Sequence, residues 1–214
     1  MRFEEVRGSG VRTKRGTAVR AAVEMLRRGG LLAHPTATVY GLGGPADAET
    51  DAEIARLKGR TIGRPLLRLA ADEAAARRLW PAARWDEAAA RLAEALWPGP
   101  LTLVLDDGSE SGFAVRVEAH PLMRGILAEW GRLMSSTSLN RTAEPPARDP
   151  EEARRILAAF PTSRRGALLL DAGGLPGPPP STVVSLRGGA PRLLREGAVP
   201  SGRLQEVLGE GIVG

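Results

Sequence analysis

The feature that most constrains the fold is an alternation between short apolar runs and longer amphipathic stretches. Residues 17–28 place apolar side chains at helical spacing, and residues 31–33 follow as a short apolar run that ends before Pro35. The same alternation continues through the rest of the 214 residues. It predicts an α/β fold. Because some of the strands adjoin through short turns, a mixed sheet is favoured over a purely parallel one.

Capping residues and turns set the limits of the expected elements. Thr17 and Gly29 bound the first helix, Thr50 and Glu53 form a capping box, and Asp149 precedes Pro150. We expect helices over residues 17–28, 50–57, 72–79, 86–96, 121–130 and 150–159, with a last short helix capped by Ser201. We expect strands over residues 31–33, 38–42, 66–70, 101–105, 113–117, 133–137, 167–170, 183–186 and 192–194, the last two joined by a Gly188-Gly189 turn.

The composition excludes several kinds of site. The chain has no cysteine, so disulfides, thiolate zinc sites and cysteine nucleophiles are absent. The two histidines, His34 and His120, lie far apart, which argues against a histidine-rich metal centre or a Ser-His-Asp triad. We expect structural roles for both of them, and packing roles for the four tryptophans. With so few ligand residues of these types, we expect no protein-bound metal. No apolar run is long enough to span a membrane, and residues 1–10 lack the apolar stretch of a signal peptide, so we expect a cytoplasmic protein.

The charge favours anionic partners. The net charge is +5 and the isoelectric point about 10.7, as expected for a protein that binds nucleotides or RNA. Lys14 and Lys58 are the only lysines among 30 basic residues. Arginine is therefore the default cation, so a lysine at a motif position carries more information.

Two segments in the first third of the chain have the character of a ligand site. Thr36, Thr38 and Tyr40 surround a strand break followed by glycines, which lets a ligand approach the backbone closely, although an ordinary strand end fits as well. Lys58-Gly59-Arg60 follows a helix end and could neutralise a polyphosphate. The alternative is that the cation only stabilises the negative C-terminal end of the helix dipole. We expect Lys58 to be partly exposed.

Two later segments are less specific by themselves. Residues 135–138 form a hydroxyl run that leads to Asn140 and could donate to phosphate or ribose oxygens, or simply form local turns. Residues 97–100, Trp-Pro-Gly-Pro, make a rigid turn without an ionisable group. We expect residues 141–148 and 176–180 to be loops beside a site.

In this order and spacing, the segments resemble the threonylcarbamoyl-AMP synthase (YrdC-like) family in its short form. The resemblance covers about residues 17–200 and rests on residues 35–42, 58–60, 97–102, 116–120, 138–140, 181–184 and 194–197. It implies a single domain over residues 1–214. It also implies a twisted mixed β-sheet with flanking helices around a basic concave cleft.

The resemblance also implies a reaction and a set of site residues. Family members condense L-threonine, bicarbonate and ATP into threonylcarbamoyl-AMP and pyrophosphate, with magnesium bridging the phosphates, and the product serves tRNA modification. The downstream partners would be tRNA or tRNA-modification proteins. By position, the catalytic cations that bind the phosphates are Lys58 and Arg60. The other nucleotide-binding residues are Thr137, Ser138, Asn140 and Arg195. The residues that bind the substrate threonine are Thr36, Thr38, Arg116 and Ser181.

Some positions depart from the family pattern. Ala37 stands where the family usually has Glu, Arg64 replaces a second lysine, Ser185 replaces Asp, and Leu139 is bulkier than the usual Ala. Ala37 removes a charge from the expected threonine pocket. This leaves two alternatives open, a catalytically altered paralogue that acts as an RNA-binding module and a paralogue that acts on another carbamoyl compound.

Overall fold

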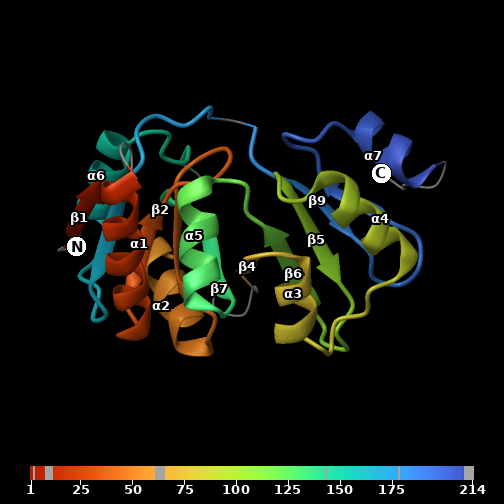
Figure 1. Cartoon of the computed structure of the whole chain (residues 1–214), viewed down its shortest axis with the longest axis horizontal. Coiled ribbons are helices and arrows are strands. Elements are labelled where there is room, and N and C mark those ends of the chain that lie inside the picture. The colour runs from red at the N-terminus through yellow and green to blue at the C-terminus, as the bar shows by residue number, and fades with distance from the viewer. Residues whose placement is uncertain (2, 8–11, 61–65, 143, 178, 210–214) are drawn as a thin grey trace.

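A computed structural model of the chain describes residues 1, 3–7, 12–60, 66–142, 144–177 and 179–209. Its strands form one sheet in the order β1-β8-β2-β3-β7-β4-β6-β5-β9-β10, with helices packed against it (Figure 1). The strands are β1 Glu4–Arg7, β2 Leu31–His34, β3 Gly41–Pro45, β4 Leu67–Ala70, β5 Leu101–Leu105, β6 Phe113–Val117, β7 Met134–Ser138, β8 Ala167–Asp171, β9 Thr182–Ser185 and β10 Arg192–Arg195. The helices are α1 Arg12–Arg27, α2 Ala48–Lys58, α3 Glu73–Leu79, α4 Glu87–Leu96, α5 Pro121–Trp130, α6 Pro150–Ala159 and α7 Ser201–Leu208.

The sheet is mixed, as the sequence predicts. Strands β1 and β2 both run parallel to β8, β4 is parallel to β6 and β5 to β9, whereas β3 is antiparallel to both of its neighbours. The β9–β10 pair is antiparallel and its connection contains Gly188 and Gly189, both at positive φ, which confirms the expected hairpin.

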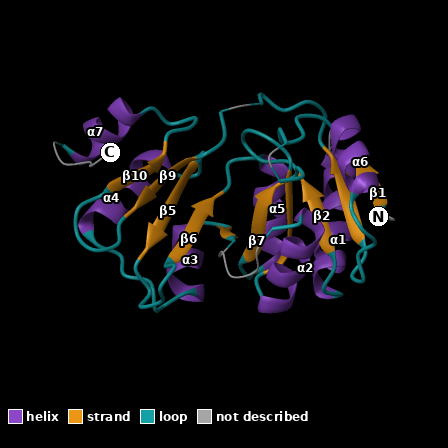
Figure 2. Ribbon diagram, turned by 180° about the vertical axis from the view of Figure 1, so that it is seen from behind, coloured by secondary structure: helices purple, strands orange, loops and turns teal. Residues whose placement is uncertain are grey.

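Strands β1, β8, β2, β3 and β7 form a doubly covered half of the sheet. Leu32 and Leu168 pack against α1 and α5 on one face, while their neighbours Leu31 and Leu169 pack against α2 and α6 on the other. Figures 1 and 2 show α1 and α5 on one face of this half and α2 on the opposite one. Both faces are therefore core, which explains the continuous apolar runs in β2 and β8.

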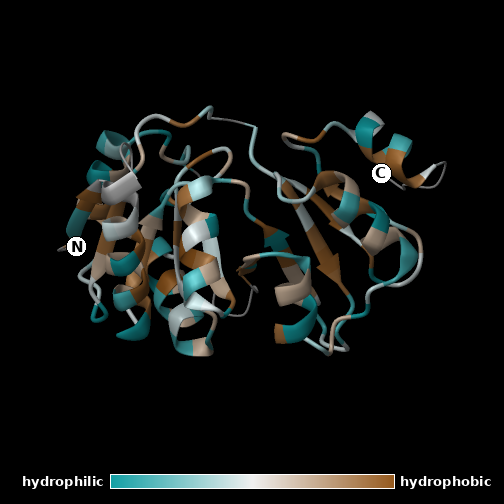
Figure 3. Ribbon diagram, in the orientation of Figure 1, coloured by the Kyte–Doolittle hydropathy of each residue, from teal (hydrophilic) through white to brown (hydrophobic). Residues whose placement is uncertain are grey.

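Strands β4, β6, β5, β9 and β10 form the other half, in which the described helices cover only one face beyond β4; we call it the singly covered half. Alternate residues of β5 and β6 pack in one cluster with α3, α4 and α7; they are Leu101, Leu103, Leu105, Phe113, Val115 and Val117. Figure 3 shows the strongly hydrophobic colour of β5 next to α4. The residues between them, such as Thr102 and Arg116, point the other way and line a cavity.

The two halves meet where β7 pairs with β4. Arg68 of β4 makes two hydrogen bonds to Asp51 of α2, from Nη1 to Oδ1 at 2.8 Å and from Nη2 to Oδ2 at 2.7 Å. Ser135 of β7 donates from Oγ to Asp51 Oδ1 at 2.6 Å. This bidentate ion pair ties one helix and both junction strands together.

Several expected boundaries are wrong for local reasons. Helix α1 begins at Arg12, so Thr17 lies inside it, although Gly29 ends it at φ 75° as predicted. Asp47 caps α2 by accepting from the Thr50 N–H at 2.7 Å, so Thr50 is a buried helical residue and not a cap. Helix α7 begins at Ser201, and Pro200 holds the cap position.

Two strands differ from the expectation. Strand β3 begins at Gly41 instead of residue 38, because Thr36 folds residues 36–39 into a turn. Strand β1 was not predicted, since its four residues, Glu-Glu-Val-Arg, carry no apolar run, and it forms by pairing with the edge of β8.

Candidate functional site

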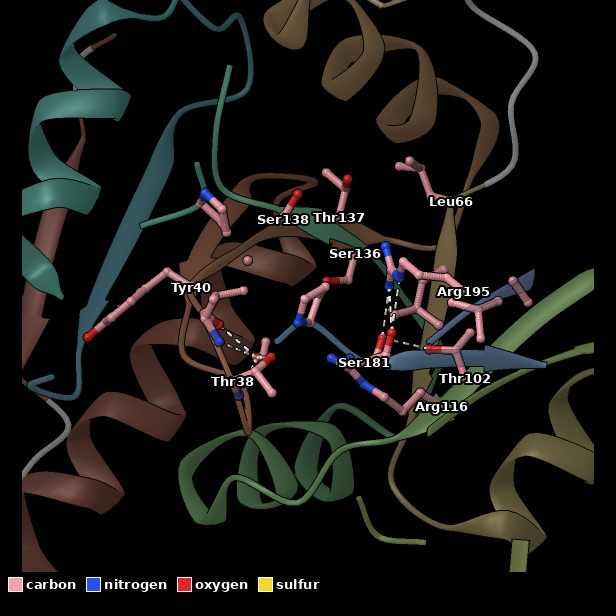
Figure 4. A pocket seen from close by; sticks show the side chains of 18 of the residues that line it. Thr38, Tyr40, Leu66, Thr102, Arg116, Ser136, Thr137, Ser138, Ser181 and Arg195 are labelled. Carbon is pink, nitrogen blue, oxygen red and sulfur yellow. Dashed lines mark hydrogen bonds between the residues drawn. The ribbon is translucent and has the colours of Figure 1, made fainter. Parts of the chain in front are cut away.

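A cavity of about 380 Å³ lies where the two halves of the sheet meet. Figure 4 shows side chains from both halves pointing into it. From the doubly covered half and its loops come Thr36, Thr38, Val39, Tyr40, Gly41, Ser136, Thr137, Ser138 and Pro146. From the other half and the segment before β4 come Arg60, Leu66, Leu67, Thr102, Ala114, Arg116, Pro180, Ser181, Val183 and Arg195.

The cavity begins where the α1/α5 layer ends. Leu69 of β4 packs in the α1/α5 cluster, and its register partner on β6 is Arg116. Register partners on neighbouring strands share a face of the sheet. The polar face of β6 thus continues a core face, at a place that none of the described helices covers.

A tight turn forms one wall. Thr36 Oγ1 donates to the Val39 carbonyl at 2.7 Å and accepts from the N–H groups of Thr38 and Val39, each at 3.2 Å. Tyr40 anchors the turn, since its hydroxyl donates to the Gly173 carbonyl at 2.9 Å and accepts from the Ala172 N–H at 3.0 Å. Burial raises the pKa of Tyr40 to about 12, so this hydroxyl stays protonated. The turn therefore has a fixed shape before any ligand binds.

Ser136 presents an acceptor to the cavity. His34 is buried, and burial lowers its pKa to about 4, so its imidazole is neutral. Its Nδ1 lies 3.1 Å from the Pro35 carbonyl, which can only accept, so Nδ1 carries the proton. Nε2 then accepts from Ser136 Oγ at 3.1 Å, and the hydroxyl oxygen is left with lone pairs for a ligand. His34 thus has the structural role that the sequence predicts.

Two arginines dominate the opposite wall. Arg195 donates from Nε and Nη2 to the Ser181 carbonyl at 3.1 and 2.8 Å, and the Ser181 hydroxyl lies 3.2 Å from that of Thr102. Burial and the nearby charge of Arg116 lower the pKa of Arg195. Arg116 is 5 % exposed, and its Nη2 donates to Glu118 at 2.6 Å. Its buried Nε has no hydrogen-bond partner among the described residues, which is costly unless a ligand accepts from it.

Lys58 lies behind the cavity wall. It is the last residue of α2 and is 8 % exposed, so the expectation of a partly exposed side chain is wrong. The end of the helix turns its ammonium inward, where it donates to the Ser138 carbonyl and, at 2.7 Å, to Asn140 Oδ1. Burial and the charge of Arg60 lower the pKa of Lys58 to about 8. Ser138 Oγ also donates to Asn140 Oδ1, at 2.6 Å, so these three residues form one network.

The donor set of the cavity does not fit a metal held by the protein. Magnesium prefers carboxylate oxygens, and none of the described residues of the cavity wall is Asp or Glu. Nor do the described residues contain a cluster of three or more His, Cys, Asp or Glu side chains placed to hold a metal. In the same part of the chain, no helix is both long and apolar enough to cross a membrane.

The family model Sua5/YciO/YrdC, described as telomere recombination, matches residues 24–197. The chain belongs to this family. The threonylcarbamoyl-AMP synthase of Chromohalobacter salexigens is 39 % identical over 180 residues, covering 78 % of this chain and 92 % of the relative. That of Stenotrophomonas maltophilia is 37 % identical, covering 75 % and 90 %. The family resemblance and the prediction of an enzyme are thus confirmed.

Solved structures of the Sua5/YciO/YrdC family have the same fold. Sua5 of P. abyssi complexed with L-threonine matches with a TM-score of 0.82 and 29 % identity, covering 100 % of this chain and 63 % of the other. This chain therefore spans less than two thirds of that Sua5. YciO of E. coli matches with a TM-score of 0.76 and 25 % identity, covering 92 % and 96 %.

The structure brings most of the expected family residues together. Eight line the cavity: Thr36, Thr38, Arg60, Arg116, Thr137, Ser138, Ser181 and Arg195. Lys58 and Asn140 do not line it and reach it through Ser138. Arg64 lies outside the described residues. The four tryptophans are absent from the lining and pack elsewhere, as expected; Trp80, for example, stacks on Phe113 with centroids 4.8 Å apart.

Thr102, Ser136 and Glu118 belong to the site or its support but were not predicted as site residues. The signal for Thr102 was available, because it is the polar residue in the otherwise apolar run of β5. Ser136 lay inside the hydroxyl run but was not singled out. Glu118 was missed because the bond that ties it to the turn comes from the backbone of Ala37, 81 residues away in the chain.

Proposed function

We propose that the chain is a threonylcarbamoyl-AMP synthase, which condenses L-threonine, bicarbonate and ATP and releases pyrophosphate. The observation that carries the proposal is Arg116, a buried guanidinium with an unpaired Nε in the wall of a cavity rich in hydroxyl groups. A guanidinium matches a carboxylate in shape and charge. Threonine supplies that carboxylate, and the solved Sua5 with L-threonine supports the assignment.

The amino acid would lie between the tight turn and the arginine wall. In this arrangement Arg116 holds the carboxylate, and the hydroxyls of Thr38 and Ser181, together with the turn that Thr36 shapes, surround the rest of the molecule (Figure 4). Ser136 accepts a hydrogen bond from an N–H or O–H of the ligand, because its own proton goes to His34.

The nucleotide would lie toward the end of β7. Thr137 and Ser138 line that side of the cavity, and Asn140 fixes Ser138 through the hydrogen bond to its Oδ1. Arg60 and Arg195 face the phosphates. Lys58 acts from behind Ser138, where its ammonium has three N–H donors and uses two of them on described residues.

The reaction needs no protein nucleophile. Bicarbonate takes up a proton and loses water to give carbon dioxide; the neutral amine of threonine adds this carbon dioxide and loses a proton, which gives a carbamate. A carbamate oxygen then forms a bond to the α-phosphorus of ATP, and the bond from that phosphorus to the pyrophosphate oxygen breaks. Both reactants are anions, so the protein has to hold them in line and offset their repulsion. Arginines and hydroxyls suit that task, and magnesium would enter with the nucleotide.

The test is pyrophosphate release by the purified chain with ATP, magnesium, bicarbonate and L-threonine, with L-serine and glycine as controls. Release that requires threonine and bicarbonate supports the synthase. Release with another amino acid keeps the mechanism and changes the substrate. A folded chain that binds ATP and releases nothing would overturn the proposal.

An RNA-binding paralogue is the second candidate, and the isoelectric point of about 10.7 together with Ala37 favours it. It predicts tRNA binding that weakens steeply with salt and occurs without turnover.

In the synthase proposal, the product is passed on in the cytoplasm to tRNA or to tRNA-modification proteins.

A further inference from the structure

A fully buried carboxylate, Glu118, lies behind the wall that carries Arg116. It follows β6 directly and is 0 % exposed. Its Oε1 accepts from the backbone N–H groups of Ala37, Ala119 and His120 at 2.8, 2.9 and 3.2 Å. Its Oε2 accepts from Arg116 Nη2 at 2.6 Å. Four donors therefore compensate the burial of its charge.

Two of these four bonds, those to the Ala37 N–H and to Arg116, connect the two walls of the cavity. Ala37 lies between Thr36 and Thr38 in the tight turn, whereas Arg116 belongs to β6 in the singly covered half. No strand pairing joins these two segments, since β7 and β4 lie between β3 and β6 in the sheet. The carboxylate of Glu118 thus sets the separation between the hydroxyls of the turn and the guanidinium.

Glu118 also sets the direction of Arg116. With Nη2 engaged, the guanidinium cannot rotate freely, and its Nε stays buried and unpaired among the described residues. A ligand carboxylate then meets a donor that is already oriented, which lowers the entropic cost of binding. Residue 37 is an uncharged alanine where the family usually has Glu, yet Glu118 places a carboxylate against the same turn.

We propose that Glu118 is a positioning residue for the amino-acid substrate, acting through Arg116 and through the turn at Thr36–Thr38. The inference rests on the proposed function, since it assumes that this cavity takes L-threonine. Glu118 touches neither the nucleotide residues of β7 nor Lys58 in any hydrogen bond of the described residues. Its loss should therefore affect the amino acid selectively.

The experiment is calorimetric titration of the wild-type chain and Glu118→Gln with L-threonine and, separately, with ATP. We expect the Kd for threonine to rise at least about tenfold and that for ATP to change less than about twofold. In turnover, KM for threonine rises while kcat at saturating threonine changes little. Glu129→Gln, an exposed carboxylate on α5, is the control and should match the wild type.

The outcomes separate the two proposals. A wild-type chain that neither binds threonine nor releases pyrophosphate with it rejects the proposed function before any variant is compared. With an active wild type, unchanged threonine affinity in Glu118→Gln, or equal losses for both ligands, overturns the positioning role. If Glu118→Gln does not fold, Glu118→Asp keeps the charge and shortens the reach by one methylene, and the same selective loss is expected of it.

Discussion

The doubly covered and singly covered halves of the sheet use the same strand geometry for different purposes. In the first, β2 and β8 are apolar on both faces, because helices lie above and below them. In the second, alternate residues of β5 and β6 pack against helices, and two of the residues between them, Thr102 and Arg116, are polar and line the cavity. The cavity lies where no described helix covers one face of a continuous sheet, and polar residues within otherwise apolar strands mark that face in the sequence.

The largest expected change in stability comes from a substitution in the core of the doubly covered half. Leu169 is 0 % exposed and packs with Leu157 and Phe160. Leu169→Ala should lower the free energy of unfolding by about 2–5 kcal/mol through the cavity that it leaves. Urea denaturation measures the loss.

The same variant tests whether the halves are separable. At temperatures where Leu169→Ala is folded, its affinity for threonine should equal that of the wild type. Leu194, which is 54 % exposed on β10, is the matched control, and Leu194→Ala should change stability by less than about 0.5 kcal/mol. If the folded Leu169→Ala variant binds threonine more weakly than the wild type, the two halves act as one unit.

The next effect concerns Lys58, at the end of a helix of the doubly covered half. In the proposed function its ammonium offsets phosphate charge, so Lys58→Ala should lower kcat/KM about 100-fold. Stability should change much less, because the variant loses two hydrogen bonds and also removes a cation from a buried position.

Arg56→Ala provides the control for Lys58. Arg56 is another cation in the last turn of α2, and its side chain is 44 % exposed. Turnover should stay near the wild-type rate in this variant. A large fall in melting temperature for Lys58→Ala at an unchanged rate would assign Lys58 a purely structural role.

The comparison also explains how much the sequence could reveal. Strands β5 and β6 and helices α5 and α6 were predicted at their observed bounds, because the spacing of apolar residues and the Asp149 cap before Pro150 are local signals. The start of β3 was misplaced because the hydroxyl of Thr36 competes for the backbone. Strand β1 could not be found, since only β8 gives it a partner.

The cavity wall was predictable to a similar degree. Residues with a motif around them, such as Arg116 and Ser181, were found, and they do lie together. Glu118 was not, because its importance comes from bonds to the backbone of a turn 81 residues away. The burial of Lys58 was also missed, since the sequence places it at a helix end but does not say which way that end faces.

A smaller effect is expected at the junction of the halves. Asp51→Asn removes the charge that two nitrogens of Arg68 and the hydroxyl of Ser135 share, and both charged side chains are largely covered, with 22 % and 13 % exposed. The free energy of unfolding should fall by about 1.5–3 kcal/mol, the range for hydrogen bonds to charged groups. Because the pair joins α2, β4 and β7, threonine and ATP affinity should fall as well.

The control for the junction is an exposed ion pair of similar geometry. Glu73 and Arg77 lie one turn apart on α3, with side chains 35 % and 40 % exposed. Glu73→Gln should cost no more than about 0.5 kcal/mol in unfolding titrations and leave affinity unchanged. If Asp51→Asn behaves in the same way, the junction does not depend on this pair.

The smallest effect is a pH dependence that has opposite signs for binding and for stability. Burial, together with the charge of Arg60, lowers the pKa of Lys58 from 10.5 to about 8. As pH rises through 8 the ammonium loses its proton, so ATP affinity should fall, by at most about tenfold per pH unit for a single proton. Between pH 8 and 10.5 the unfolded chain binds the proton that the folded chain has lost, so this group's contribution to stability rises over the same window. Lys58→Arg keeps a cation that does not titrate there and should remove both trends. ATP titrations and urea unfolding at pH 7 and 9 measure them, and a fall in affinity that persists in Lys58→Arg would place the titrating group elsewhere.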